Sequence, residues 1–352
     1  MDIITLDNEL PVNVCGITRH VPPVRMDGFR VRPQYRNLIN SMSLREDAGE
    51  TAVIQRALDY VAAKATEVMY PELRALRFVP EIGEVPLGAR SFTFAVQDYQ
   101  GIAEEVSGAG KSLPRANTSL SENTSAIKPY GMMYAWTTEE LRAFSYAAGT
   151  GRGPAIALDT SRAKAAQIGI ARKLDNVIAF GDPRDSRIKG FLNDSGVTVS
   201  TAAINWNSAT FAELLSEMLA LANNPVVTSK ELFIPDAILL PTTYLQLVQS
   251  VMNPLGNKSV LQAFNESMQA AGRSVSVESW PLLATADAGL TGPRAVSYVR
   301  NKEIVGSIVP ALFIAQPPQA VGLEWQVPCE GVCGGAVIRA PLGVYYRDGL
   351  NG

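Results

Sequence analysis

The sequence predicts an α+β fold, and three features of the chain indicate it. The first is a long helical pattern, Pro154–Phe180, with glycines before it and Gly181 after it. The second is Gly190–Val309, in which short apolar runs alternate with amphipathic helices. The third is Phe313–Tyr346, where prolines and glycines separate short strand-like runs. Helices and strands that are partly segregated along a chain are typical of this class.

Composition excludes several classes of function. The 352 residues suffice for a substantial core and for two domains. A formal net charge of −3 argues against a dedicated nucleic-acid-binding protein. No apolar run reaches the roughly 18 residues of a membrane span, and the N-terminus lacks the apolar core of a signal peptide. Cys15, Cys329 and Cys333 are expected to be reduced thiols in a cytosolic product.

Residues 1–48 are predicted to form an extended arm, because several prolines interrupt any helix. Between Gly16 and Arg45 the arm is basic, because one acid, Asp27, stands against six arginines: Arg19, Arg25, Arg30, Arg32, Arg36 and Arg45. A basic arm can follow a phosphate backbone, pair with acidic patches on neighbouring subunits, or remain a solvated tail. The residues leave these three interpretations open.

The segment after the arm predicts a helix and then a projection. Glu50–Met69 has apolar residues at helical spacing and ends at Pro71. Arg90–Gln97 alternates apolar and polar residues, as a half-buried strand does. Ile102–Ala126 has no apolar period, and Lys128–Trp136 is apolar again and predicts a return strand. A polar excursion of this length is expected to contact another molecule.

Two helices follow the projection. Thr137 and Glu140 have capping-box spacing, which predicts a helix from Thr137 to about Ala148. Pro154–Phe180 predicts a rod of roughly 40 Å, stopped by Gly181 and Pro183. Its inward stripe is rich in alanine: Ala163, Ala166, Ile170, Leu174 and Val177. Such a stripe allows close approach to a sheet.

The remaining elements are shorter. Predicted helices cover Phe211–Ala222, Thr242–Val251 and Ser259–Ala271. Predicted strands cover Ala237–Leu240, Val275–Val277, Val296–Val299 and Val305–Val309, with further strands in Phe313–Tyr346. These elements complete the mixed helix and strand pattern.

Motifs that suggest catalysis or cofactor binding are incomplete. Gly108–Ser112 resembles the end of a phosphate-binding loop, but Glu105 replaces the first glycine and Pro114 follows instead of a helix. Gly149–Gly153 follows a helix rather than the strand that a dinucleotide site requires. Cys329 and Cys333 have no nearby histidine for a zinc site, and His20 is the single histidine. No catalytic, cofactor or metal site is therefore expected, and a nucleotide-binding enzyme is the alternative of another class.

The order of these elements resembles the major capsid proteins of tailed bacteriophages, which have the Hong Kong 97-type fold also found in encapsulin shells. The resemblance covers nearly the whole chain. It implies an N-terminal arm (1–48), an extended hairpin loop (88–135) and a peripheral domain (49–87, 136–190 and 310–352) with a spine helix at about 154–180. It also implies an axial domain (191–309), and the end of the chain, Arg339–Gly349, resembles the closing strands of the family.

The resemblance implies a shell protein that self-assembles into hexamers and pentamers around double-stranded DNA, in a virion built in the host cytoplasm. Its partners would be further copies of itself, with scaffold, portal and decoration proteins and packaged DNA, and no membrane. An encapsulin-like cellular compartment is the alternative that shares the fold. The implied intersubunit contacts in the extended loop are Glu104, Glu105, Lys111 and Arg115. The implied inner-surface residues of the arm are Arg19, Arg25, Arg30, Arg32 and Arg36.

Overall fold

The computed structural model describes residues 11–14, 17–20, 71–83, 85–103, 115–150, 158–284 and 292–351. The chain divides into two compact units, Met1–Ala63 and Lys64–Gly352. In the first unit, β1 (Pro11–Val14) and β2 (Ile17–His20) pair as an antiparallel ladder. The predicted helix Glu50–Met69 lies outside the described residues, as does most of the predicted arm.

The long helix of the second unit is α5 (Leu158–Phe180). The predicted stripe is confirmed at Ala166, Ile170, Leu174 and Val177, which are buried, whereas Ala163 is only half-buried. Gly181 ends the helix with a φ of 77°, a conformation that a side chain would disfavour. At 1.5 Å per residue, the described part of α5 is about 35 Å long. Residues 154–157 of the predicted helix lie outside the described range.

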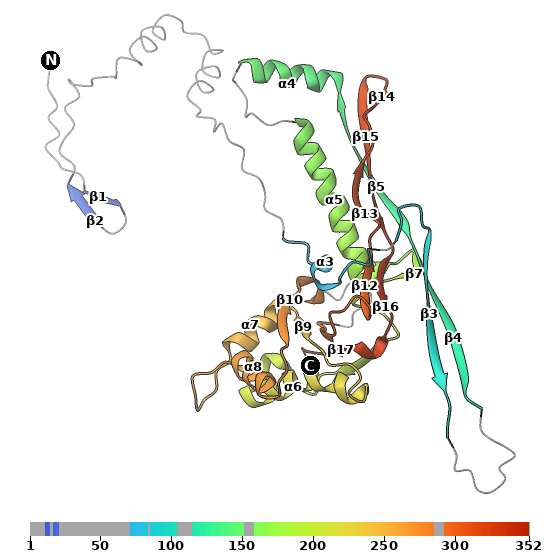
Figure 1. Cartoon of the computed structure of the whole chain (residues 1–352). Coiled ribbons are helices and arrows are strands. Elements are labelled where there is room, and N and C mark those ends of the chain that lie inside the picture. Colours follow the sequence, from blue (N-terminus) through green and yellow to red (C-terminus); the bar gives the residue numbers. More distant parts are fainter. Residues whose placement is uncertain are drawn as a thin grey trace, which may run out of the picture. The chain divides into compact units, whose positions relative to one another are not determined.

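A four-stranded antiparallel sheet packs on α5 (Figure 1). β15 (Glu324–Cys333) is paired with β5 (Lys128–Thr137) along one side and with β13 (Ala311–Ala315) and β14 (Gln319–Val321) along the other. Gly331 of β15 allows the close approach, since a Cβ there would lie 2.6 Å from Cγ2 of Ile170. The alanine-rich stripe and this glycine together seat the helix on the sheet.

A second, mixed sheet has five strands in the order β10-β9-β11-β17-β8. Their bounds are β10 (Ser276–Ser279), β9 (Ala237–Leu240), β11 (Ala295–Tyr298), β17 (Val344–Asp348) and β8 (Thr198–Thr201). The helices beside it are α6 (Phe211–Thr228), α7 (Thr242–Ser250) and α8 (Val260–Ala270). Their inward residues, with Trp206, form a second core. All three helices were predicted, although α6 continues through Pro225 beyond its predicted end.

Smaller elements connect these layers. β12 (Val305–Ile308) pairs with β16 (Gly335–Ile338), and β6 (Gly181–Asp182) pairs with β7 (Asp185–Lys189). The short α3 (Ala75–Phe78) packs on α5, where the Asp175 carboxylate accepts the Ala75 N–H at 2.8 Å. Within the described residues, no helix is long and apolar enough to cross a bilayer.

The predicted excursion Ile102–Ala126 is wrong in its second half. β4 (Asn117–Ala126) is a ten-residue strand that pairs with β3 (Ser91–Gln100). The predicted return strand exists as β5, but its partner is β15. β4 escaped detection because both of its faces are exposed over most of its length, so it has no apolar period.

Candidate functional site

The β3–β4 hairpin is exposed over most of its length. Its two strands pair over their full length, from Ser91 opposite Ala126 to Gln100 opposite Asn117. A hydrogen bond of 2.9 Å joins the hydroxyls of Thr93 and Thr124 across the strands. In Figure 1 the hairpin extends away from the sheets of its unit. Within the described residues, no further strand pairs with either edge.

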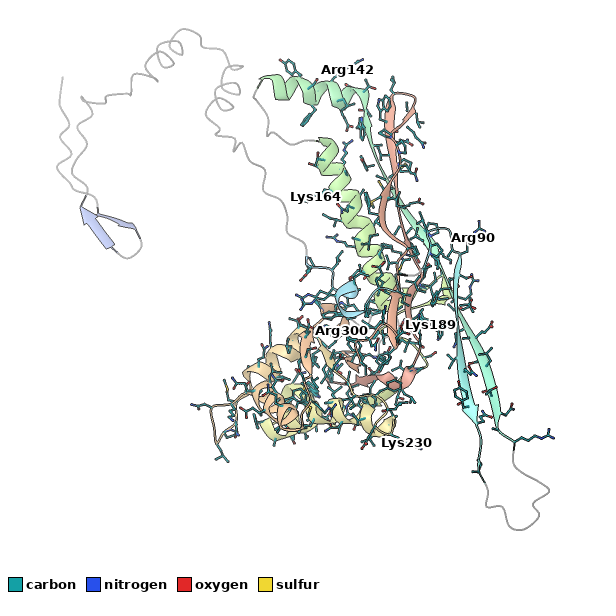
Figure 2. The ribbon with its side chains drawn as sticks, in the orientation of Figure 1. Arg90, Arg142, Lys164, Lys189, Lys230 and Arg300 are labelled. Atoms are coloured by element: carbon teal, nitrogen blue, oxygen red, sulfur yellow. The ribbon has the colours of Figure 1, made fainter. Side chains whose placement is uncertain are left out.

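The root of the hairpin is fixed to the body. Phe92 and Phe94 are half-buried against the small core around Ile308, Val332 and Val337. The Ser125 hydroxyl donates to the Gly334 carbonyl oxygen at 2.9 Å. Figure 2 shows Arg90 at this root, where its carbonyl oxygen accepts the Ile127 N–H at 2.9 Å. These contacts set the direction in which the hairpin leaves the subunit.

Beyond Phe94 the hairpin carries apolar side chains into solvent. Tyr99 is 77% exposed and Leu120 is 66% exposed, on the same face of the ribbon. Val96 is exposed on the opposite face. An isolated two-stranded ribbon is marginally stable in water, and exposed apolar groups mark interaction surfaces. The geometry therefore favours a ribbon that is completed by another molecule.

Charged groups surround the hairpin root without forming a catalytic pair. Asp185 accepts hydrogen bonds from Arg187 and, at 2.8 Å, from the Lys128 ammonium. These bonds hold the pKa of the Asp185 carboxyl well below its usual range. The Tyr130 hydroxyl donates to Asp182 at 3.1 Å, and burial, followed by the Asp182 charge, raises the Tyr130 pKa. Each group has a partner, so this network serves to brace the turn between β6 and β7.

The predicted contact residues are only partly placed. Arg115 is exposed just before β4 begins. Glu104, Glu105 and Lys111 lie outside the described residues, as do Arg25, Arg30, Arg32 and Arg36 of the arm. The backbone of Arg19 lies in β2, opposite Val12. The described residues do not test whether these side chains meet, and their roles stay predictions. Sequence reasoning missed Tyr99 and Leu120, whose signal was an apolar residue in an otherwise polar stretch.

The motifs rejected at the level of sequence give no competing site in the described residues. Gly149 and Thr150 are the last residues of α4 (Thr138–Thr150), and Gly108–Ser112 lies outside the described range. Cys329 and Cys333 are buried free thiols, and burial raises the Cys333 pKa to about 11. No group of three His, Cys, Asp or Glu side chains is placed to hold a metal in the part of the chain that the structure describes.

Solved structures from phages and from a GTA particle share this fold. The capsid protein of Myoviridae phage XM1 aligns with a TM-score of 0.72 at 16% identity, over 84% of this chain and 98% of that one. The structure of Mycobacterium phage Cain aligns with a TM-score of 0.56 at 11% identity, over 86% and 99%. The capsid of a native GTA particle aligns with a TM-score of 0.55 at 10% identity, over 87% and 99%. The fold is therefore the Hong Kong 97-type capsid fold, as the resemblance implied.

The sequence itself identifies the family. Residues 101–350 match the model of the major capsid protein family, and the chain belongs to this family. No curated protein matches the chain. Membership makes the chain a capsid shell protein of a virus particle, a structural protein and not an enzyme.

Proposed function

We propose that copies of this shell protein associate head to tail, with the β3–β4 hairpin of one copy lying on the next. The observation that carries the proposal is a hairpin fixed at its root that exposes Tyr99 and Leu120 beyond it. A contact between two different surfaces of the same chain closes into a ring when its rotation allows. Rings of five and six, the pentamers and hexamers of an icosahedral shell, are the closed products that we infer.

Many such contacts together can make a stable particle, even where each single contact is weak. Each added subunit forms its later contacts within the growing ring, where the effective concentration is high. Individual hairpin contacts can then be modest while the closed particle is stable. This logic suits a largely polar ribbon with a few apolar side chains.

The turn between α7 and α8 supports a second contact, near the ring centre. Leu255 is 98% exposed at this turn, which is held by a hydrogen bond of 3.2 Å from the Gly256 N–H to the Asn253 carbonyl oxygen. The Asn253 side chain also accepts the Leu255 N–H at 3.0 Å. A rigid turn with an exposed leucine fits the proposed axial domain, residues 191–309, meeting other copies at a symmetry axis.

We assign the remaining predicted regions within this picture. The extended loop covers 88–135, and Glu104, Glu105, Lys111 and Arg115 contact a neighbour there. The arm, 1–48, lies along the inner face, where its arginines meet packaged double-stranded DNA or acidic groups of other subunits. The peripheral domain comprises 49–87, 136–190 and 310–352, and assembly occurs in the host cytoplasm.

Shortening the hairpin tests the assembly role. Gly101 and Ala116 lie close together, since a Cβ on Gly101 would be 3.5 Å from that of Ala116. An Asn-Gly turn can therefore replace Ile102–Arg115 and remove all four predicted loop contacts. We expect folded subunits with an unchanged unfolding transition and no closed shells by negative-stain electron microscopy.

A Gly-Ser loop of the original length is the matched control, because it keeps the reach of the hairpin and removes its side chains. Closed shells of normal size from the Asn-Gly variant would contradict the proposed role of the loop. Failure of the unaltered protein to form any particle, with the other virion proteins supplied, would contradict self-assembly itself.

A further inference from the structure

Residues 71–83 form a strap on the second unit and come shortly before the β3–β4 hairpin in the chain. Within the strap, α3 is followed by residues 79–82, which run beside β12. The Ser307 N–H donates to the Pro80 carbonyl oxygen at 2.8 Å, and the Ile82 N–H donates to the Ser307 carbonyl oxygen at 2.9 Å. The strap therefore extends the β12–β16 ladder by one short segment.

The strap also covers an aromatic cluster of the core. The Phe78 ring is fully buried, and its centroid lies 5.2 Å from that of Trp280. The Tyr298 hydroxyl donates to the Phe78 carbonyl oxygen at 2.7 Å, and the Phe191 ring packs against both neighbours. Without the strap these rings would meet water, so the strap acts as a lid.

Ile82 joins the strap to the root of the hairpin. It is buried in the small core around Ile308, on which Phe92 and Phe94 of β3 also pack. Its side chain lies over Gly306, where a Cβ would be 2.5 Å from the Ile82 Cγ1. When Ile82 leaves, this core loses a buried side chain, and Phe92 and Phe94 are held less firmly.

The strap can open while the rest of the body stays folded. α3 is one turn of four residues, and a helix of this length is not stable by itself. No strap residue belongs to the four-stranded sheet, the five-stranded sheet or α5, so opening leaves their hydrogen bonds intact. Segments of this kind open at a lower free energy than the whole structure.

A buried carboxylate lowers the cost of opening. Asp175 of α5 is 9% exposed and accepts the Ala75 N–H of the strap at 2.8 Å. Burial raises the pKa of this carboxyl above its ordinary 3.8, although the N–H groups of the strap act in the opposite direction. Opening returns the charge to water, which offsets part of the loss of apolar burial.

We propose that the strap is a latch for the hairpin, which opens and closes in the single subunit and stays closed once the hairpin has docked on another copy. Closing seats Ile82 and so fixes the direction in which the hairpin leaves the body. The apparent affinity of assembly then depends on the closed fraction. Docking in turn favours the closed strap, because such coupling is reciprocal. The inference rests on the proposed assembly role of the hairpin and adds conformational control to it.

A disulfide that holds the strap closed tests the latch. Ile82→Cys with Gly306→Cys places two thiols on facing residues, since a Cβ on Gly306 would lie 2.5 Å from the Ile82 Cγ1 and 2.6 Å from its Cδ1. Oxidised glutathione forms the bond by taking up two electrons and two protons from the thiols. Phe78→Ala is added to this pair, because it removes the ring under the strap and shifts the reduced protein toward the open form.

The first measurement is hydrogen exchange of this triple variant, at a concentration too low for assembly. The Ile127 N–H donates to the Arg90 carbonyl oxygen at 2.9 Å and reports on the hairpin root. We expect its protection factor to be at least about tenfold higher in the oxidised than in the reduced protein, because the closed strap holds the root. Equal protection in the two forms overturns the latch.

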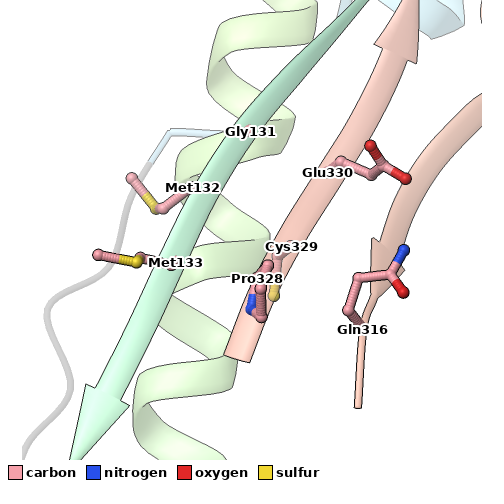
Figure 3. A pocket seen from close by; sticks show the side chains of 7 residues that line it. All are labelled: Gly131, Met132, Met133, Gln316, Pro328, Cys329 and Glu330. Atoms are coloured by element: carbon pink, nitrogen blue, oxygen red, sulfur yellow. The ribbon is translucent and has the colours of Figure 1, made fainter. Parts of the chain in front are cut away.

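Two controls accompany this measurement. Phe78→Ala with Ile82→Cys alone, treated with the same oxidant, should behave like the reduced protein, and a rise in protection there would trace the effect to the native cysteines instead. Met133→Ala truncates a side chain away from the strap: Figure 3 shows Met133 beside a hollow lined by β5, β15 and Gln316. It should leave the Ile127 amide as protected as in the unaltered protein, and an equal loss of protection would overturn the path through Ile82.

The second measurement is assembly, followed by sedimentation at a temperature where circular dichroism shows both forms folded. The reduced triple variant should assemble at least about tenfold more weakly than the unaltered protein, and oxidation should restore most of the loss. If oxidation restores nothing while the Asn-Gly variant of the hairpin still fails to form shells, the latch is wrong and the assembly role of the hairpin stands. If the Asn-Gly variant forms normal shells, the assembly role fails, and control of assembly by the strap fails with it.

Discussion

The strand β17 and the hairpin β3–β4 are opposite cases of how a strand is stabilised. β17 lies inside the five-stranded sheet, with Tyr345 and Tyr346 buried. Arg347 makes an ion pair of 2.6 Å with Glu217 of α6, and Asp348 makes one of 2.6 Å with Arg294. In the hairpin, most side chains beyond Phe94 contact solvent in the single copy.

This difference distinguishes residues that stabilise a single folded subunit from residues that we propose contact other subunits. The charged side chains of β17 are paired inside one chain, and a change there should lower the free energy of unfolding. On the hairpin, the same free energy should hardly depend on the side chains, because the single copy does not bury them. The predictions below follow this contrast, ordered by their expected effect on the free energy of unfolding of a single subunit.

The largest effect is expected for Arg347→Ala. The side chains of Arg347 and Glu217 are 10% and 7% exposed, so the change leaves a buried carboxylate without its partner. Breaking a buried ion pair typically costs about 3–5 kcal/mol. Urea unfolding of the unassembled subunit measures the loss.

The double variant Arg347→Met with Glu217→Leu is the matched control for this prediction. It removes both charges and keeps apolar volume, so it should recover most of the lost stability. A single variant as stable as the unaltered chain would show that the pair contributes nothing to the subunit.

A smaller effect is expected where α5 meets its sheet. In Gly331→Ala, the new Cβ would lie 2.6 Å from Cγ2 of Ile170 and 2.9 Å from the Leu312 carbonyl oxygen. Overpacking of this kind costs about 1–3 kcal/mol. Gly88→Ala is the control, since nothing lies within 4 Å of its added Cβ. If the two variants had equal unfolding midpoints, α5 and its sheet would have to move apart at little cost in free energy.

The elements around β17 were largely predictable from the sequence, and the reason is burial. The α5 stripe and the helices α6, α7 and α8 appear in the pattern because one face of each is buried in its own chain. The capping box predicted from Thr137 and Glu140 is confirmed, since the two residues make the hydrogen bonds that their spacing requires.

The hairpin was predictable only in its first strand. β3 shows apolar alternation because Phe92 and Phe94 pack at the root, whereas β4 has no apolar period. Nothing local indicates that β5 pairs with β15, which lies nearly 200 residues later in the chain. Tyr99 and Leu120 were missed because both are exposed in the single copy and belong to no buried apolar period.

A pH-dependent effect is expected at the start of α4. Hydrogen bonds from Arg162 and from the Thr137 N–H lower the Glu140 pKa from its ordinary 4.5 to about 2. Because the folded-state pKa lies below that of the unfolded chain, this interaction stabilises α4 fully above about pH 4.5 and is lost as the pH falls toward 2. The protection of the α4 amides, taken relative to the intrinsic exchange rate at each pH, should therefore fall in this window.

Glu140→Gln should remove most of this pH dependence. Glu213 offers an internal comparison, since it caps α6 through Thr210 and has no arginine partner in its hydrogen bonds. The acid-induced loosening of α6 at Thr210 should be smaller. Protection factors of the α4 amides that stay constant between pH 5 and 2 would contradict the assigned role of Arg162.

The smallest effect on the subunit is expected for the double variant Tyr99→Ser with Leu120→Ser. Both side chains are mostly exposed and diagonal to each other on one face of the ribbon, so the unfolding free energy should change by no more than about 0.5 kcal/mol. Assembly should nevertheless fail, because the same face loses the apolar groups that a neighbouring copy would bury. Urea unfolding and sedimentation of the same preparation measure the two quantities. If the double variant lost stability and still formed particles, the contrast between β17 and the hairpin would be wrong. The hairpin side chains would then stabilise their own subunit, as those of β17 do.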